Sequence, residues 1–279
     1  MSRISIRITS WAAAAEPVFS IQGHKPGDTG IRKVIENFWN AWSDLSKDPD
    51  SVTGRKIVRE NALALADSFN QTSKQLSDLS GDLTDNISVK STQMNTMVNT
   101  IASLNTEIRR IEGLGDTAND LRDQRDLLTD QLSEIVNIQV VENEQGYSIT
   151  IGGTALVAGP AATPVTADIL TAAAESGALT GGEVYGMIVS RDRYVKEYQQ
   201  LDSLANTLAN GELEVIVPAG SVLPGETEPL SEPRAVKVNG INGLHKLGYT
   251  LESPATTGRD FFTFWAGAAG ITAASITTL

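Results

Sequence analysis

The sequence predicts a mainly α-helical protein with β additions: an elongated antiparallel helical bundle carrying a β-hairpin, followed by a small β-rich C-terminal region. Three observations carry this prediction. Apolar residues recur at alternating steps of three and four over residues 69–111, which is typical of a long helix that packs along one stripe. The apolar period changes to two near residue 138, as in β-strands. Residues 211–279 then combine short alternating runs with many turn residues.

The long stripe predicts one helix over about residues 51–112, with a core seam along it. Of its thirteen positions, Ser73, Ser80 and Lys90 are not apolar. The ten apolar positions are Phe69, Leu76, Leu83, Ile87, Met94, Met97, Ile101, Leu104, Ile108 and Ile111. Such a seam over 43 residues corresponds to roughly 64 Å of helix. Gly81 weakens the helix by about 1 kcal/mol relative to Ala, so any bend in this helix is expected near Gly81.

Three further helices are expected, over about residues 29–47, 118–136 and 183–210, from apolar residues at helical spacing. The helix at 118–136 follows a glycine turn at Gly113 and Gly115, so it should fold back antiparallel to the long helix. Together these helices make residues 28–210 a rod-like helical domain.

The β-hairpin is expected near residues 138–158, because Ile138, Val140, Tyr147, Ile149 and Ile151 alternate with more polar residues around a turn. Residues 159–181 are interpreted as a loop with some short strand. In residues 211–279, strands are expected at 213–217 and 236–238, and a turn at 239–243; this region leads towards outer domains. Residues 1–27 are expected to form an irregular leader, either native or foreign to the protein.

Composition excludes several classes of function. The 279-residue chain has a net charge of −12 and a pI of about 4.6, which disfavours binding to nucleic acid or to anionic membranes, since phosphate contacts need clustered Lys and Arg. It contains no cysteine, so disulfides and thiolate metal sites are excluded. No stretch of 18 apolar residues is present, so no membrane-spanning helix is expected.

No motif in the sequence predicts catalysis, a cofactor or a metal. The two histidines, His24 and His245, are far apart and match no zinc spacing. The acidic run Asp116, Asp120, Asp123, Asp126 and Asp130 is interleaved with Arg122 and Arg125. We interpret it as ordinary surface ion pairs on a helix, in preference to a cation site. Likewise, Gly181, Gly182 and Gly186 are interpreted as small residues that allow close helix approach, in preference to a phosphate cradle.

Several stretches resemble a known family in the correct order along the chain. They are residues 38–49 with Arg55, residues 101–108, the run Asp120, Asp123, Gln124, Arg125 and Asp126, the pair Gly181 and Gly182 with Arg191 and Asp192, and residues 238–249. Over residues 28–279 the chain resembles the rod domain of the bacterial flagellar hook-associated protein 1 family, the first hook–filament junction proteins. The acidic run followed by a hairpin is the most specific element of the resemblance.

This resemblance implies an internal part of a longer protein that lacks the terminal inner-tube helices. It implies a structural role in the extracellular bacterial flagellum. The full-length protein would assemble with copies of itself, with the hook protein and with the second junction protein, after export with a chaperone. The chain alone is then expected to be monomeric. Two alternatives stay open: a ligand-binding or enzymatic module in residues 211–279, and a flagellin-like filament protein.

Overall fold

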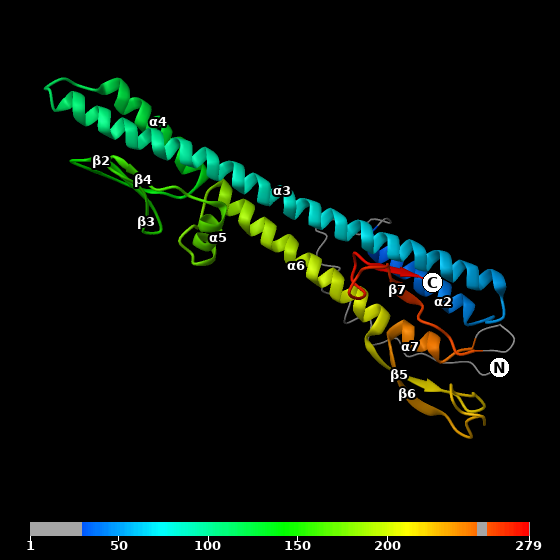
Figure 1. Ribbon diagram of the computed structural model, residues 1–279. Coiled ribbons are helices and arrows are strands. Elements are labelled where there is room, and N and C mark those ends of the chain that lie inside the picture. The colour runs from blue at the N-terminus through cyan, green and yellow to red at the C-terminus, as the bar shows by residue number, and fades with distance from the viewer. Residues whose placement is uncertain (1–29, 250–255, 279) are drawn as a thin grey trace. The chain divides into compact units, whose positions relative to one another are not determined.

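The computed structural model describes residues 30–249 and 256–278, so the expected leader at residues 1–27 lies outside the described residues. The predicted class, mainly helical with small antiparallel sheets, is confirmed (Figure 1). The helices are α2 (Ile31–Leu45), α3 (Val52–Glu112), α4 (Asn119–Ile135), α5 (Ala167–Glu175), α6 (Glu183–Asn210) and α7 (Gly240–Lys246). The strands are β1 (Gln139–Asn143), β2 (Gly146–Ile151), β3 (Thr154–Ala158), β4 (Ala161–Ala162), β5 (Glu212–Val217), β6 (Arg234–Asn239), β7 (Phe262–Phe264) and β8 (Ile276–Thr278).

Helix α3 confirms the predicted long helix. At its start the Ser51 hydroxyl accepts a hydrogen bond from the Gly54 N–H at 3.2 Å, which satisfies one of the N–H groups that the first turn leaves without a helical partner. At its end Gly115 has a φ of 92°, a left-handed conformation that glycine adopts at little cost. The chain then reverses into α4.

The described chain forms two compact units, and both α3 and α6 contribute to each of them. The first unit comprises described residues 30–77 and 196–278, and the second comprises residues 78–195. The expected boundary near residue 210 therefore lies inside the first unit. The assignment of residues 211–279 to a separate region remains a prediction.

The core of the first unit joins segments that are distant in the sequence. Phe38 of α2, and Leu65 and Phe69 of α3, are fully buried. Phe38 lies 5.8 Å from Phe262 of β7, between ring centroids, so aromatic packing fixes this C-terminal strand against α2. Buried residues of α6 and β8 complete the same cluster, including Leu201, Leu208 and Ile276.

Strands β5 and β6 pair antiparallel over their whole length, from Glu212 opposite Asn239 to Val217 opposite Arg234. Burial alternates along β5 as the sequence predicts. The predicted turn at residues 239–243 is wrong in part, because helix α7 begins at Gly240. Ile241 and Asn242 are both buried, and this packing, which the local sequence does not reveal, stabilises so short a helix.

In the second unit α4 runs antiparallel to the end of α3, as predicted. The side chain of Arg122 contacts Glu112, and that of Arg125 contacts Asn105. Later residues of α4 thus contact earlier residues of α3, as in an antiparallel pair. Strands β1 to β4 form an antiparallel meander in chain order. Its inner residues share one apolar core with α3, α4 and α6, formed by Ile149, Ile151, Leu156 and Val157 with Met94, Ile101, Leu132, Ile135, Val184 and Ile188.

The interpretation of residues 159–181 as a loop with short strand is wrong in part. This stretch contains the two-residue strand β4, but also helix α5. The Thr166 hydroxyl caps α5 by accepting a hydrogen bond from the Ile169 N–H at 3.3 Å, and Leu170 is buried. One buried leucine in an alanine- and threonine-rich stretch gives too little apolar periodicity to predict a helix.

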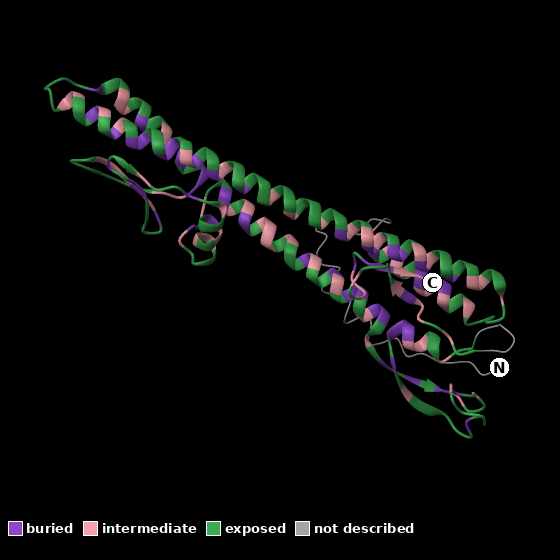
Figure 2. Ribbon diagram, viewed as in Figure 1, coloured by how far each residue is buried: buried purple, intermediate pink, exposed green. Residues whose placement is uncertain are grey.

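The seam residues of α3 differ in their burial. Six are buried, namely Phe69, Ile87, Met94, Met97, Ile101 and Ile108. Four are half-buried, namely Leu76, Leu83, Leu104 and Ile111. No residue of α3 is buried between Ser73 and Ile87, and much of this stretch is exposed in Figure 2. The apolar stripe is thus buried in two stretches and not along its whole length.

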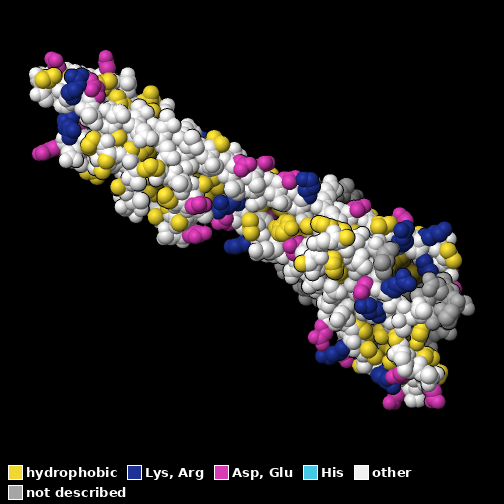
Figure 3. All heavy atoms as spheres, viewed as in Figure 1, with side chains coloured by type: hydrophobic (Ala, Val, Ile, Leu, Met, Phe, Trp, Pro, Cys, Tyr) yellow, Lys and Arg dark blue, Asp and Glu magenta, His cyan; other side chains and the backbone are white. Residues whose placement is uncertain are grey.

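The charged side chains visible in Figure 3 are interspersed, with Lys and Arg among Asp and Glu on the face shown. This face carries no basic stripe of the kind that phosphate backbones require. Among the described residues, none of the helices combines the length and the apolar character that crossing a membrane would need.

Candidate functional site

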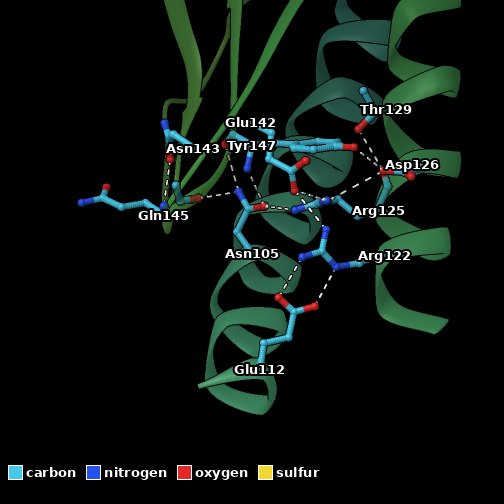
Figure 4. Close-up of polar contacts among 11 residues, drawn as sticks. Asn105, Glu112, Arg122, Arg125, Asp126, Thr129, Glu142, Asn143, Gln145 and Tyr147 are labelled. Carbon is cyan, nitrogen blue, oxygen red and sulfur yellow. Dashed lines mark hydrogen bonds and ion pairs between the residues drawn. The ribbon is translucent and has the colours of Figure 1, made fainter. Parts of the chain in front are cut away.

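The acidic motif that the sequence singled out lies at a buried polar cluster in the second unit. Its centre is Arg125 of α4, which is only 1% exposed. One guanidinium nitrogen donates to Asn105 Oδ1 at 3.3 Å and another donates to Glu142 Oε1 at 3.2 Å. The guanidinium lies 3.5 Å from the centroid of the Tyr147 ring (Figure 4). Arginine suits this place because its planar cation both stacks on an aromatic ring and donates in two directions.

Asn105 of α3 attaches the β-hairpin to the helices through its side-chain amide. Its Oδ1 accepts from the Tyr147 N–H at 3.0 Å, and its Nδ2 donates to the Tyr147 carbonyl at 3.0 Å. A second donation reaches the Gly159 carbonyl at 2.8 Å. The amide therefore replaces a neighbouring strand, since it satisfies both backbone groups of one residue.

Gly146 makes this close approach possible. A Cβ at this position would lie 2.5 Å from Asn105 Oδ1, and the φ of Gly146 is 104°. Both the space and the backbone conformation thus require glycine here. The hairpin turn and the asparagine on α3 are matched in shape.

A ring of charged groups closes the cluster towards solvent. Arg122 donates to both carboxylate oxygens of Glu112, at 2.7 and 2.8 Å, and to Glu142 at 3.1 Å. The hydrogen bond from Arg122 holds the pKa of Glu112 below its usual value, as a bidentate cation does for a carboxylate. Tyr147 donates its hydroxyl proton to Asp126 at 2.7 Å. Burial raises the pKa of the Tyr147 phenol, and the hydrogen bond to Asp126 raises it further.

The interpretation of the acidic run as ordinary surface ion pairs within one helix is wrong for its two arginines. Arg125 is buried, and the closest carboxylates of Arg122 come from α3 and β1. Asp126 contacts Arg125 and Tyr147. The remaining members of the run are exposed, namely Asp116, Asp120, Asp123, Gln124 and Asp130.

The other motif residues lie outside the hydrogen bonds of this cluster. Gly182, with a φ of 91°, lies against the end of α4, where an added Cβ would be 2.5 Å from the Ile135 carbonyl oxygen. The N–H of Gly181 donates to Asn137 Oδ1 at 3.1 Å. Arg191 pairs with its neighbour Asp192 at 3.0 Å. Close packing thus explains Gly182 but not Gly186, where an added Cβ would meet nothing within 4 Å.

Asparagines that attach a non-helical segment to a helix recur in the chain, and sequence reasoning missed them. Asn95 of α3 pairs with both backbone groups of Val165, each at 2.8 Å. In the first unit, Asn242 of α7 pairs with both backbone groups of Phe262, at 2.9 and 2.7 Å. A polar residue at a core-facing helix position is the only sequence signal for such a contact.

The cluster can hold a hairpin in place, and its polar groups are mostly consumed in doing so. In the part of the chain that the structure describes, no three His, Cys, Asp or Glu side chains lie close enough to hold a metal ion. His245 contacts the Arg259 carbonyl oxygen at 2.5 Å, and His24 lies outside the described residues.

Comparison with known proteins gives a consistent result. The family model described as the flagellar hook-associated protein FlgK helical domain matches residues 24–212. The chain is similar to the flagellar hook-associated protein 1 of Bacillus subtilis, with 34% identity over 119 residues, covering 43% of this chain and 24% of the relative. It is also similar to the protein of that name from Escherichia coli, with 30% identity over 149 residues, covering 50% and 27%.

Among solved structures, the chain is similar to the flagellar hook junction protein FlgK from Burkholderia pseudomallei. The TM-score is 0.57 at 24% identity, and the similarity covers 72% of this chain and 40% of that one; at this identity it shows the fold alone. The chain spans about a quarter of the length of the two curated relatives described above.

Proposed function

Because the chain belongs to the family of the flagellar hook-associated protein FlgK helical domain, we propose that it is a structural component of the bacterial flagellum and forms part of the junction between hook and filament. The match over residues 24–212 supports the family, and the relatives, which are flagellar hook-associated proteins, support the role.

The burial of Arg125 is the structural observation that best supports a structural role over a catalytic one. The most polar side chain of the motif faces inward and is 1% exposed, and its contacts all come from the same unit. A catalytic or binding group must reach a substrate. Arg125 is instead enclosed by the β-hairpin of the same unit, where it stabilises the position of that hairpin.

The partners proposed for the full-length protein follow from this role. It assembles with copies of itself between the hook protein and the second junction protein, outside the cell, after export with a chaperone. The chain spans about a quarter of the length of its relatives and is proposed to be monomeric alone. Light scattering at micromolar concentration tests this: the mass of one 29.7 kDa chain is expected, and a stable oligomer would contradict it.

The two alternatives are weaker. A flagellin-like filament protein is not favoured, because the matching family is that of a hook-associated protein. A ligand-binding or enzymatic module in residues 211–279 lies almost wholly beyond the matched residues 24–212. No observation in the described part of that segment points to a ligand.

Immunogold electron microscopy with antibodies against this chain tests the proposal in the bacterium that makes it. Label is expected at the base of each filament, where it meets the hook. Label along whole filaments would indicate the flagellin-like alternative. Label confined to the cell interior would contradict a flagellar role.

A further inference from the structure

The three Asn-Gly dipeptides of the sequence meet at one place in the first unit. They are Asn210-Gly211, Asn239-Gly240 and Asn242-Gly243. The Gly240 N–H donates to the Gly211 carbonyl at 2.6 Å, and Asn242 Nδ2 donates to Asn210 Oδ1 at 3.0 Å. These two hydrogen bonds join the end of α6 to the start of α7.

Asn-Gly is also the dipeptide most open to spontaneous deamidation. The backbone nitrogen of the glycine attacks the Cγ of the asparagine side chain, and glycine has no side chain to hinder the approach. The N–Cγ bond forms, the Cγ–Nδ2 bond breaks, and ammonia leaves with the proton of the glycine nitrogen. Water then opens the resulting five-membered succinimide to aspartate or isoaspartate. The reaction requires the glycine nitrogen to be brought into line with Cγ.

The fold protects Asn242 and Asn210 from this rearrangement. Asn242 is 3% exposed, and its amide makes three hydrogen bonds, two with Phe262 and one with Asn210. For Asn210, the Gly211 N–H is bonded to the Thr207 carbonyl at 2.8 Å, and the Asn210 amide bonds Asn206 and Asn242. In each case several hydrogen bonds must open together before the side chain can turn.

Asn239 is held far less tightly. It is exposed, and its side chain makes no capping hydrogen bond to α7. The bond from Gly240 N–H to Gly211 must open to free the attacking nitrogen, and this bond lies at the end of the β5–β6 pairing, where Asn239 faces Glu212. From this geometry we infer that Asn239 is the deamidation site of the folded protein, and that folding suppresses the reaction at Asn210 and Asn242.

The consequence of modification differs between the sites. At Asn239, deamidation adds a carboxylate at an exposed strand end, which the fold tolerates. At Asn242, it would remove the donor to the Phe262 carbonyl and place a carboxylate beside it. A chain deamidated at Asn242 while unfolded would therefore fail to dock β7.

The test compares each site between the folded chain and the same chain in concentrated guanidinium chloride, at mildly alkaline pH. Cleavage after lysine and arginine releases residues 238–246 as one peptide, and fragment ions that end at Gly240 separate Asn239 from Asn242. Asn210 falls in the peptide of residues 197–234. The ratio of the unfolded to the folded rate measures the protection of each asparagine.

Protection at Asn210 and Asn242 is expected to exceed that at Asn239 by at least about tenfold. This ratio corresponds to an opening free energy that is ~1.4 kcal/mol greater at Asn210 and Asn242 than at Asn239. The variant Asn239→Ser should abolish the modification of the folded 238–246 peptide. Equal protection at all three sites would overturn the inference, as would faster modification of folded Asn242 or Asn210 than of Asn239.

Discussion

The side-chain amide of Asn105 pairs with both the N–H and the carbonyl of Tyr147, each at 3.0 Å. The pairing joins the C-terminal part of a 61-residue helix to the second residue of strand β2. It also holds the Tyr147 ring over Arg125. One amide and one cation therefore add polar contacts to the apolar core that holds the hairpin against the helices.

Replacing Asn105 by Ala should destabilise the second unit strongly. Three backbone groups, the Tyr147 N–H and the carbonyls of Tyr147 and Gly159, lose their amide partner. The Tyr147 carbonyl keeps a hydrogen bond from the Gly159 N–H at 3.3 Å, but leaving the other two groups unsatisfied costs about 3 kcal/mol in the free energy of unfolding. Chemical denaturation measures the loss, and faster hydrogen exchange of residues 139–151 should locate it.

Asn99 provides a matched control on the same helix. It is exposed, and its amide bonds only the Asn95 carbonyl one turn before it. Asn99→Ala should change the free energy of unfolding by less than about 0.5 kcal/mol. Equal losses at Asn99 and Asn105 would show that the hairpin does not depend on the Asn105 amide.

Arg125→Met should destabilise the protein by about 1–3 kcal/mol, because the stacking on Tyr147 and the hydrogen bonds to Asn105 and Glu142 are lost. Asp123→Asn, an exposed change two positions earlier in the same helix, should have little effect. Thermal melts of both variants decide the matter. Comparable shifts in melting temperature would indicate that the exposed acidic residues have a structural role of their own.

Gly81→Ala should stabilise the protein by up to about 1 kcal/mol. Gly81 lies within α3, and an added Cβ would meet nothing within 4 Å, so only the gain in helix propensity remains. Gly182→Ala is the opposite case, with a φ of 91° and a carbonyl oxygen 2.5 Å from the added Cβ. It should cost more than about 1 kcal/mol. Denaturant midpoints with opposite shifts are expected; shifts of the same sign would refute this account.

The Glu112–Arg122 pair should make stability depend on acid pH. The pKa of Glu112 is lowered in the folded chain from an ordinary value of 4.5, through its hydrogen bond to Arg122. The folded state therefore binds fewer protons, and the contribution is present above pH 4.5 and lost as the pH falls through the lower folded value.

Glu112→Gln should accordingly lower the denaturation midpoint at pH 7, and its difference from the parent chain should shrink towards pH 3. Glu134→Gln, at an exposed position of α4, serves as the control. A deficit of Glu112→Gln that stays constant over this pH range would exclude the ion pair as its cause.

The sequence predicts helices α2, α3, α4 and α6 and the hairpin well, because their signals are local. The three–four spacing identifies α3, and the alternation around residues 143–146 identifies the hairpin. Helix α5 is missed because its packing depends on one buried residue, Leu170.

The polar cluster could not be predicted from the sequence for a related reason. Arg125 stands among aspartates on α4, a pattern typical of a solvated helix face. Its partners Glu142 and Asn105 lie 17 and 20 residues away, on elements that only the tertiary fold brings together. Asn105, an amide between the buried Ile101 and Ile108 and beside exposed polar residues, gives no separate signal.

Complementation tests whether the protein has a structural role at the hook–filament junction. The full-length protein that contains this chain would be expressed in a strain that lacks its own first junction protein, and hooks would be inspected by electron microscopy. The account predicts filaments attached to hooks and restored swimming. Hooks that stay bare, with the expressed protein exported and intact and filament subunits lost to the medium, would contradict it.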